Sequence, residues 1–117
     1  MDSDYKKQLK VKSGIVKRIT REFESYEKEV AKDKERISKL RESGSDEHTI
    51  KKQEDVLQET LSMLPNTRKR LQDAVEDLQN LMREHENDEG FKESPEWAEA
   101  NLNLESAHTK VLGESIV

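Results

Sequence analysis

Apolar residues recur along most of the chain at alternating intervals of three and four residues. With Val16 at position a of a heptad, the first set of expected core positions is Leu9, Lys12, Val16, Ile19, Phe23, Tyr26, Val30, Asp33, Ile37 and Leu40. Eight of these ten residues are apolar, as in a helix that buries one stripe of its surface. The pattern predicts a helix over about residues 4–42.

The stretch "ESGSD", from Glu42 to Asp46, interrupts this periodicity. Gly44 suits the left-handed conformation that ends many helices, and Ser45 or Asp46 can cap the start of the next one. The connection is short, so the two helices should lie antiparallel.

A second set of core positions follows: Ile50, Glu54, Leu57, Leu61, Leu64, Arg68, Leu71, Val75, Leu78, Met82 and His85, of which eight are apolar. The spacing keeps its phase across Pro65, whereas a true loop usually loses it. Proline in a helix interior removes one hydrogen bond and costs about 3 kcal/mol. The sequence therefore predicts one helix over about residues 46–86, kinked at Pro65 by a bend or a local restart.

A third helix is predicted over about residues 94–113, after a polar connection. Ser94 is a good N-cap and Pro95 suits the first helical position. The expected core positions are all apolar: Trp97, Ala100, Leu104, Ala107 and Val111. The fold class is therefore all-α, and residues 1–117 form one domain, an elongated antiparallel three-helix bundle resembling a spectrin-like rod, with a short third helix.

The short third helix can cover only half of the rod. The second helix widens its apolar stripe at Ala74 and Leu81 but carries threonine at the equivalent Thr60 and Thr67. Three-helix packing should therefore end near Pro65. Beyond it we expect a two-helix arm of about residues 26–64, weakened by a wet layer.

That wet layer is expected because Asp33 and Glu54 occupy adjacent core layers. Two like charges are not comfortably buried together. The sequence therefore predicts local weakness in the arm.

The composition supports a thin, soluble rod. The 117 residues are 31% hydrophobic and 40% charged, and they contain no cysteine. No segment reaches the ~20 apolar residues of a membrane span, and the first residues lack the apolar region of a signal peptide. We expect a cytoplasmic protein that neither spans nor coats a membrane.

Charge is distributed unevenly along the chain. Residues 1–41 contain 13 Lys and Arg against 8 Asp and Glu, whereas residues 42–117 contain 8 against 18. The basic first helix fits an acidic partner, and it fits equally the acidic remainder of its own chain.

Catalytic, metal and cofactor sites are not expected. The four glycines are scattered and form no phosphate-binding loop, and "EHENDE" from Glu84 to Glu89 reads as solvated charge rather than as metal ligands. The basic stretch of residues 6–21 has no aromatic residues for stacking on bases, and the whole protein carries a net charge of −5. We therefore expect no enzyme, no cofactor, no metal and no nucleic-acid partner.

A candidate partner surface comes from Val56 and Met63, seven residues apart at outward positions of the arm. With Tyr26 and Leu64 they could form an apolar strip bordered by Lys51 and Lys52. Isolated exposed apolar residues are also common on protein surfaces, so the pattern alone leaves both interpretations open.

Four segments resemble the tubulin-binding cofactor A family, also called tubulin-specific chaperone A. They are "KVKSGIVKRITRE" (10–22), "YEKEV" (26–30), "IKKQEDVLQET" (50–60) and "LPNTRKRLQDAVEDLQ" (64–79). The resemblance covers roughly residues 8–82. Helix 3 and the termini are similar only in character, and the acidic connection at residues 87–94 is not typical of the family.

This resemblance implies a three-helix bundle with a proline-interrupted second helix and a role in tubulin folding. Members of the family are ATP-independent chaperones that capture β-tubulin intermediates released by the cytosolic chaperonin. They keep β-tubulin available for other tubulin-folding cofactors and for assembly with α-tubulin, in the cytoplasm and in association with the microtubule cytoskeleton. They bind through helical surfaces rather than loops, and a basic face suits tubulin because tubulin is acidic.

The resemblance also suggests partner-binding positions. Carried over by motif, these are Lys17, Arg18, Tyr26, Lys28, Lys51, Lys52, Gln53, Leu57, Pro65 and Arg70, to which the apolar strip adds Val56 and Met63. A rival interpretation is a structural or adaptor bundle that binds another coiled coil or self-associates. The sequence leaves monomer and homodimer open.

Overall fold

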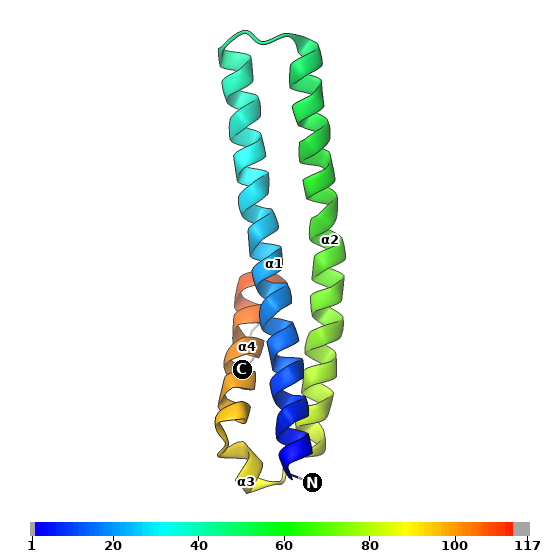
Figure 1. The fold of residues 1–117 in the computed structure, drawn as a ribbon, viewed down its shortest axis with the longest axis vertical. Helices are drawn as coiled ribbons and strands as arrows, with labels where there is room; N and C mark the ends of the chain where they lie inside the picture. Colours follow the sequence, from blue (N-terminus) through cyan, green and yellow to red (C-terminus); the bar gives the residue numbers. More distant parts are fainter. Residues whose placement is uncertain (1, 114–117) are drawn as a thin grey trace.

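The computed structural model describes residues 2–113, which form helices and short connections without any strand. The elements are α1 (Asp2–Glu42), α2 (Glu47–Glu84), α3 (Glu89–Lys92), α4 (Pro95–Ala107) and the π-helical turn η1 (His108–Leu112). The long helices α1 and α2 run antiparallel along the whole molecule, and α4 with η1 lies alongside the lower half of the rod in Figure 1. The molecule measures 64 × 21 × 18 Å. The expected all-α, elongated antiparallel bundle is confirmed.

The turn between α1 and α2 has the geometry that the sequence predicted. Gly44 has a φ of +74°, and Ser45 N–H donates to the Leu40 carbonyl at 3.0 Å, as in a Schellman C-cap. Asp46 then caps α2 by accepting from Thr49 N–H at 2.8 Å, which lowers the pKa of the Asp46 carboxyl. The two long helices are therefore joined by a tight, defined turn.

The second helix continues through Pro65, so a local restart of the helix there is wrong. Pro65 is exposed, and Figure 1 shows α2 bowed outward around its middle without a break. A proline ring pushes away the carbonyl four residues before it and bends the helix away from the proline side. A proline on the solvent side therefore curves α2 toward α1, and packing against α1 retains the helix.

Buried residues in α2 confirm that three-helix packing ends near the proline. They all follow it: Thr67, Leu71, Val75, Leu78, Leu81 and Met82. Thr67, expected beside the core, is fully buried, and its hydroxyl has no hydrogen-bond partner among the described residues. Arg68, expected in the core, is instead exposed, with its guanidinium carbon 5.4 Å from the centre of the Phe23 ring.

Small polar side chains lie where α4 packs on α1. Ser13 and Asn103 are buried, and Asn103 Nδ2 donates to Ser13 Oγ at 2.7 Å. Thr20, also buried, donates to the carbonyl of Val16 in its own helix at 2.8 Å. Each polar group thus has a partner, so burying it does not carry the cost of an unpaired group.

The polar connection before α4 contains a short helix and an aromatic cluster that the sequence analysis did not predict. Phe91 of α3 is buried, with its ring centre 4.3 Å from that of Tyr5, and His85 lies 3.6 Å from Tyr5 on the same measure. Burial raises the pKa of Tyr5, and the charges of Glu84 and Asp88 raise it further. This cluster closes the end of the bundle where the chain enters α1.

The start of α4 has the predicted cap. Ser94 Oγ accepts from Trp97 N–H at 3.2 Å, and Pro95 is the first helical residue. The helix ends in the π-helical turn η1, after which Gly113 has a φ of +71°.

Candidate partner-binding surfaces

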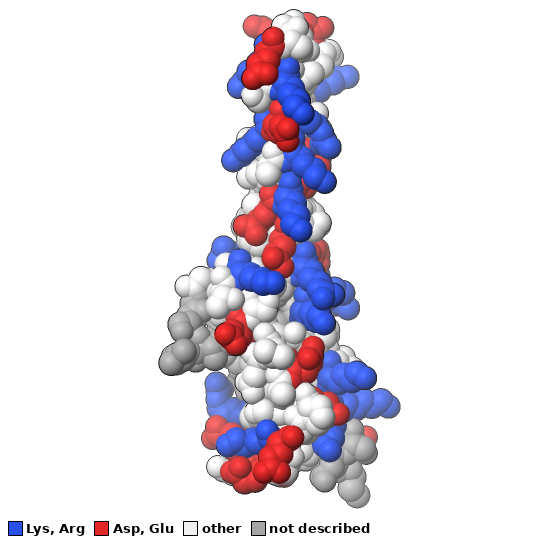
Figure 2. Space-filling model, turned by 90° about the vertical axis from the view of Figure 1, so that its left-hand side faces the viewer, with Lys and Arg blue, Asp and Glu red and all other residues white. Residues whose placement is uncertain are grey.

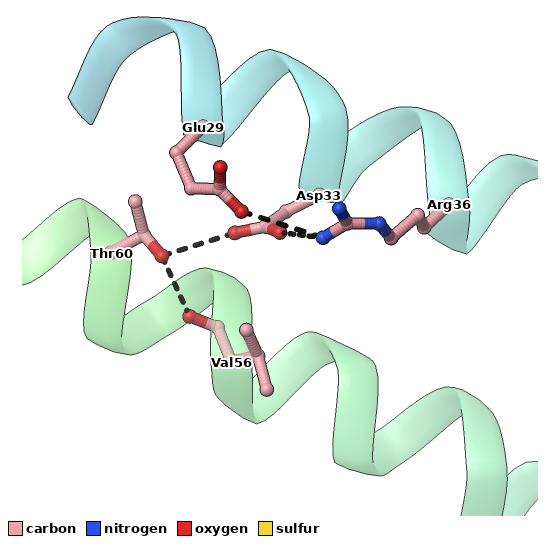
Figure 3. A network of polar contacts seen from close by, with 5 residues as sticks. All are labelled: Glu29, Asp33, Arg36, Val56 and Thr60. Atoms are coloured by element: carbon pink, nitrogen blue, oxygen red, sulfur yellow. Dashed lines mark hydrogen bonds and ion pairs between the residues drawn. The ribbon is translucent and has the colours of Figure 1, made fainter. Parts of the chain in front are cut away.

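The arm of residues 26–64 is held together by a polar network at its centre (Figure 3). Asp33 is completely buried and accepts from Arg36 at 3.0 Å and from the Thr60 hydroxyl at 3.0 Å. Arg36 also lies 3.4 Å from Glu29. A buried carboxylate is tolerated when charge and hydrogen bonds compensate it, as they do here.

The expected pair of like charges in adjacent layers is not formed. Glu54 pairs with Arg41 at 2.9 Å near the tip of the arm, and its side chain is 45% exposed. Asp33 lies at the level of Thr60, farther down the rod, and is completely buried. The expectation of a wet Asp33–Glu54 layer is therefore wrong, because each carboxylate has its own arginine.

Val56 is exposed as expected, at 43%, whereas Met63 is half-buried. Met63 is thus more covered than expected, although it lies on the same side of α2 as Val56. Both belong to a line of α2 residues at seven-residue intervals, which continues through Arg70 and Asp77. Arg70 donates to Glu22 of α1 at 2.9 Å, and Asp77 pairs with Lys12. Ion pairs to α1 thus occupy the lower part of this line. We call its two apolar residues in the arm, Val56 and Met63, the arm strip.

The other α2 candidates lie on different sides of the helix. Lys51 and Lys52 are exposed, and Gln53 and Leu57 are half-buried. Lys51 borders an open groove with Glu54 and Gln58, while Val56, five residues on, lies about 140° around the helix axis. Lys51 therefore does not border the arm strip, whereas Lys52, four residues before Val56, lies on the same side of the helix as Val56. The border expected from the sequence thus holds for Lys52 and not for Lys51.

The α1 candidates divide between a paired and an unpaired set. Lys17 lies 3.8 Å from Glu99 of α4, so it contributes to packing within the molecule. Arg18 and Lys28 are exposed, and among the described residues neither forms an ion pair. Tyr26 is half-buried and Pro65 is exposed at the middle of α2.

The sequence analysis missed the most exposed large apolar side chains. Val11 of α1 is 58% exposed and Leu102 of α4 is 61% exposed. The heptad frame places Val11 seven residues before Arg18, at an outward position, so the reasoning that singled out Val56 could have found it. Leu102 was less predictable, because α4 is short and the orientation of its outer face depends on packing.

The described residues contain neither a candidate metal site nor a candidate membrane span. No group of three or more His, Cys, Asp or Glu residues suited to a metal ion occurs within residues 2–113. Within the same range no helix is long and apolar enough to cross a membrane.

Comparison with known proteins relates the whole rod to one family. The family model for tubulin binding cofactor A matches residues 4–104. The chain belongs to the tubulin binding cofactor A family. It is 40% identical to human tubulin-specific chaperone A over 100 residues, covering 86% of this chain and 90% of the human protein. It is also 40% identical to tubulin-folding cofactor A of Arabidopsis thaliana over 97 residues, covering 82% of this chain and 84% of the plant protein.

The fold agrees with that of a solved member of the family. The crystal structure of tubulin folding cofactor A from Arabidopsis thaliana superposes with a TM-score of 0.84 at 33% identity, covering 92% of this chain and 98% of that one. The similarity therefore extends to α4, beyond the segments that carried the resemblance in the sequence.

Proposed function

We propose that the protein is a tubulin-folding cofactor that captures β-tubulin intermediates and holds them for assembly with α-tubulin. The observation that carries this proposal is the match of nearly the whole rod to tubulin binding cofactor A. The curated relatives are named as tubulin-specific chaperones or tubulin-folding cofactors. On this proposal the protein works in the cytoplasm and passes β-tubulin on with the help of other tubulin-folding cofactors.

A long, partly uncovered helical surface suits capture without catalysis. The surface grooves on the arm are open, such as the one lined by Ile37, Leu57 and Lys34. They offer a partner the half-buried side chain of Leu57 and the edge of the buried Ile37, and they do not enclose a small molecule. Binding that shields an aggregation-prone surface of the client requires only contact area and reversible release.

The arm strip is the part of this surface that we propose as the apolar contact. Val56 is exposed, and its backbone carbonyl accepts from the Thr60 hydroxyl, which also bonds to Asp33. Met63 lies about two helical turns beyond Val56, so the two residues lie on one line along α2. The β-branched side chain of Val56 has few rotamers to lose, so ordering it on binding costs little entropy, which favours such a position as a contact.

The test is to mix the purified protein with chaperonin-released β-tubulin and measure the complex by size-exclusion chromatography with light scattering. We expect a 1:1 complex with β-tubulin and none with α-tubulin. Val56→Ser with Met63→Ser should weaken the complex, whereas Leu102→Ser, which removes an exposed apolar residue from α4, should not.

Two outcomes would contradict the proposal. A concentration-dependent homodimer without a tubulin complex would favour the structural or adaptor bundle. An unchanged affinity of the double variant, with circular dichroism showing it folded, would exclude the arm strip as the contact while leaving tubulin capture intact.

A further inference from the structure

One line of exposed residues on α1 carries positive charge without any acidic residue. It consists of positions spaced by three and four residues on the outer face of the helix, all exposed: Lys7, Val11, Gly14, Arg18, Arg21, Ser25, Lys28 and Lys32. We call this line the basic ridge. From residue 7 to residue 32 it extends about 38 Å at 1.5 Å per residue. On the same line Asp4 precedes the ridge and Glu35 follows it.

The cations of the basic ridge differ from several other cations of α1 in having no ion-pair partner among the described residues. Off the ridge, Lys12 pairs with α2, Lys17 with α4, and Arg41 with α2. Within residues 4–113, no ion pair forms to Lys7, Arg18, Arg21, Lys28 or Lys32. Figure 2 shows Lys and Arg side chains following one another along this side of the molecule. Lys6, Lys10 and Lys34 of α1 also form no ion pair within residues 4–113, so the ridge is distinguished by five unpaired cations that share one exposed line.

Acidic residues flank the basic ridge on both sides and are themselves occupied. Glu22 bonds to Arg70 at 2.9 Å and Glu29 lies 3.4 Å from Arg36 on one side. Glu24 lies 3.9 Å from Lys110 of η1 on the other. Beside residues 21–32 the unpaired positive charge is therefore confined to the ridge itself. Beside its lower part, Lys10 and Lys17 add further positive charge.

The lower part of the ridge offers an apolar contact between cations. Val11 is 58% exposed, and it lines a shallow surface groove with Ile15 and Lys7. Gly14, one turn beyond Val11, has open space where a side chain would stand. An apolar side chain of a ligand can lie here against Val11 without a protruding neighbour at position 14.

We propose that the basic ridge binds an acidic, extended segment of the client polypeptide, with an apolar residue of that segment against Val11. The inference rests on the proposed function, in that it takes the client to be tubulin, and it adds the surface and the chemistry of the segment. At 3.3–3.4 Å per residue, an extended chain needs about 11 residues to follow the ridge. Binding to such unpaired, exposed cations is sensitive to salt.

A nucleic acid fits the ridge less well than a polypeptide. None of the eight ridge positions is aromatic, so bases have no ring on which to stack. The flanking carboxylates of Glu22 and Glu24 would face the wide, uniformly charged backbone of a duplex. A polypeptide can place carboxylates at intervals and supply the apolar side chain for Val11.

The ridge can be tested with a fluorescent 12-residue peptide of alternating Glu and Gly that contains one Phe, measured by anisotropy at low and high salt. We expect binding that weakens as salt rises and that is lost when every Glu is replaced by Gln. Arg21→Gln with Lys28→Gln should weaken binding at least threefold at low salt, because each exposed charge contributes a factor of about two. Lys69→Gln with Arg83→Gln, the matched control on α2, should leave it unchanged.

The same variants are then compared with β-tubulin in the chromatographic assay. If the wild-type protein binds β-tubulin and the ridge variant binds it equally well, the ridge inference is overturned and the proposed function stands. If the protein binds the peptide through the ridge but no tubulin, the proposed function fails and the acidic-segment site stands. Equal or tighter binding of a 12-nucleotide DNA strand would overturn the assignment to a polypeptide.

Discussion

Asp33 shows how one residue sets the character of the arm. Its carboxylate occupies a core position between two helices, and Arg36 and Thr60 supply the charge and the donor that make its burial tolerable. The Thr60 hydroxyl also lies 3.1 Å from the Val56 carbonyl, so one hydrogen is shared between two acceptors. A single buried polar pair of this kind favours one register of two helices over others.

The pair predicts a specific pattern of mutant stability. Thr60→Val should lower the free energy of unfolding by about 1–3 kcal/mol, because it leaves the buried Asp33 carboxylate one donor short. Asp33→Leu combined with Thr60→Val should recover most of that loss, since apolar groups replace both partners. Urea unfolding followed by circular dichroism measures both values.

The control for this pair is Thr109→Val in η1, whose hydroxyl donates only to the carbonyls of Glu105 and Ser106 in the preceding turn of α4. It should change the free energy of unfolding far less than Thr60→Val. A double variant that is less stable than Thr60→Val alone would show that the Asp33 carboxylate contributes net stability.

Among the elements, α2 is the one whose sequence conflicts with its conformation. Pro65 lies in the interior of a 38-residue helix, where it removes the hydrogen bond to the Leu61 carbonyl. Buried apolar residues below the proline and cross-helix contacts above it keep both halves helical. Proline thus changes the curvature of α2 without ending it.

Replacing Pro65 should therefore stabilise the protein. Pro65→Ala restores one backbone donor and a good helix former, and the free energy of unfolding should rise by up to about 3 kcal/mol. Pro95→Ala is the matched control, because proline at a first helical position has no hydrogen bond to restore. If Pro65→Ala instead destabilised the protein, the bow in α2 would be required for the fit between α1 and α2.

At the scale of the whole molecule, the rod has a three-helix half and a two-helix half. Below Pro65, α4 and η1 complete a core that contains fully buried Leu9, Leu71 and Leu78. In the arm, Leu57 and Leu61 at equivalent positions are only half-buried. Apolar side chains that the lower half buries in its core therefore remain partly accessible to a partner in the arm.

This difference predicts unequal protection from hydrogen exchange along single helices. Amides of residues 30–42 and 50–62 should exchange faster than those of residues 9–23 and 71–82, because fewer buried contacts must be lost to open the arm. The comparison within α1 is its own control, since both segments belong to one continuous helix. Equal protection along α1 would mean that the two-helix arm is as stable as the bundle.

Much of this architecture was predictable because it depends on neighbours in sequence. Heptad spacing marked the faces of α1 and α2, and Gly44, Asp46 and Ser94 act locally as helix caps. The candidate site was less predictable. Val56 is exposed as expected, but Met63 is half-buried and Lys51 borders another groove, because small rotations of a helix decide how far such boundary positions are covered.

By itself, the sequence determined the helices, their order, their antiparallel course and the place where the bundle thins. These follow from periodicity, capping and short connections, all of which act over a few residues. Only the tertiary structure decided that Phe91 closes the end of the bundle, that Asp33 is compensated by Thr60, and which cations of α1 remain unpaired. Each of these depends on side chains from different helices meeting at one level of the rod, and that level is set by the packing of the whole molecule.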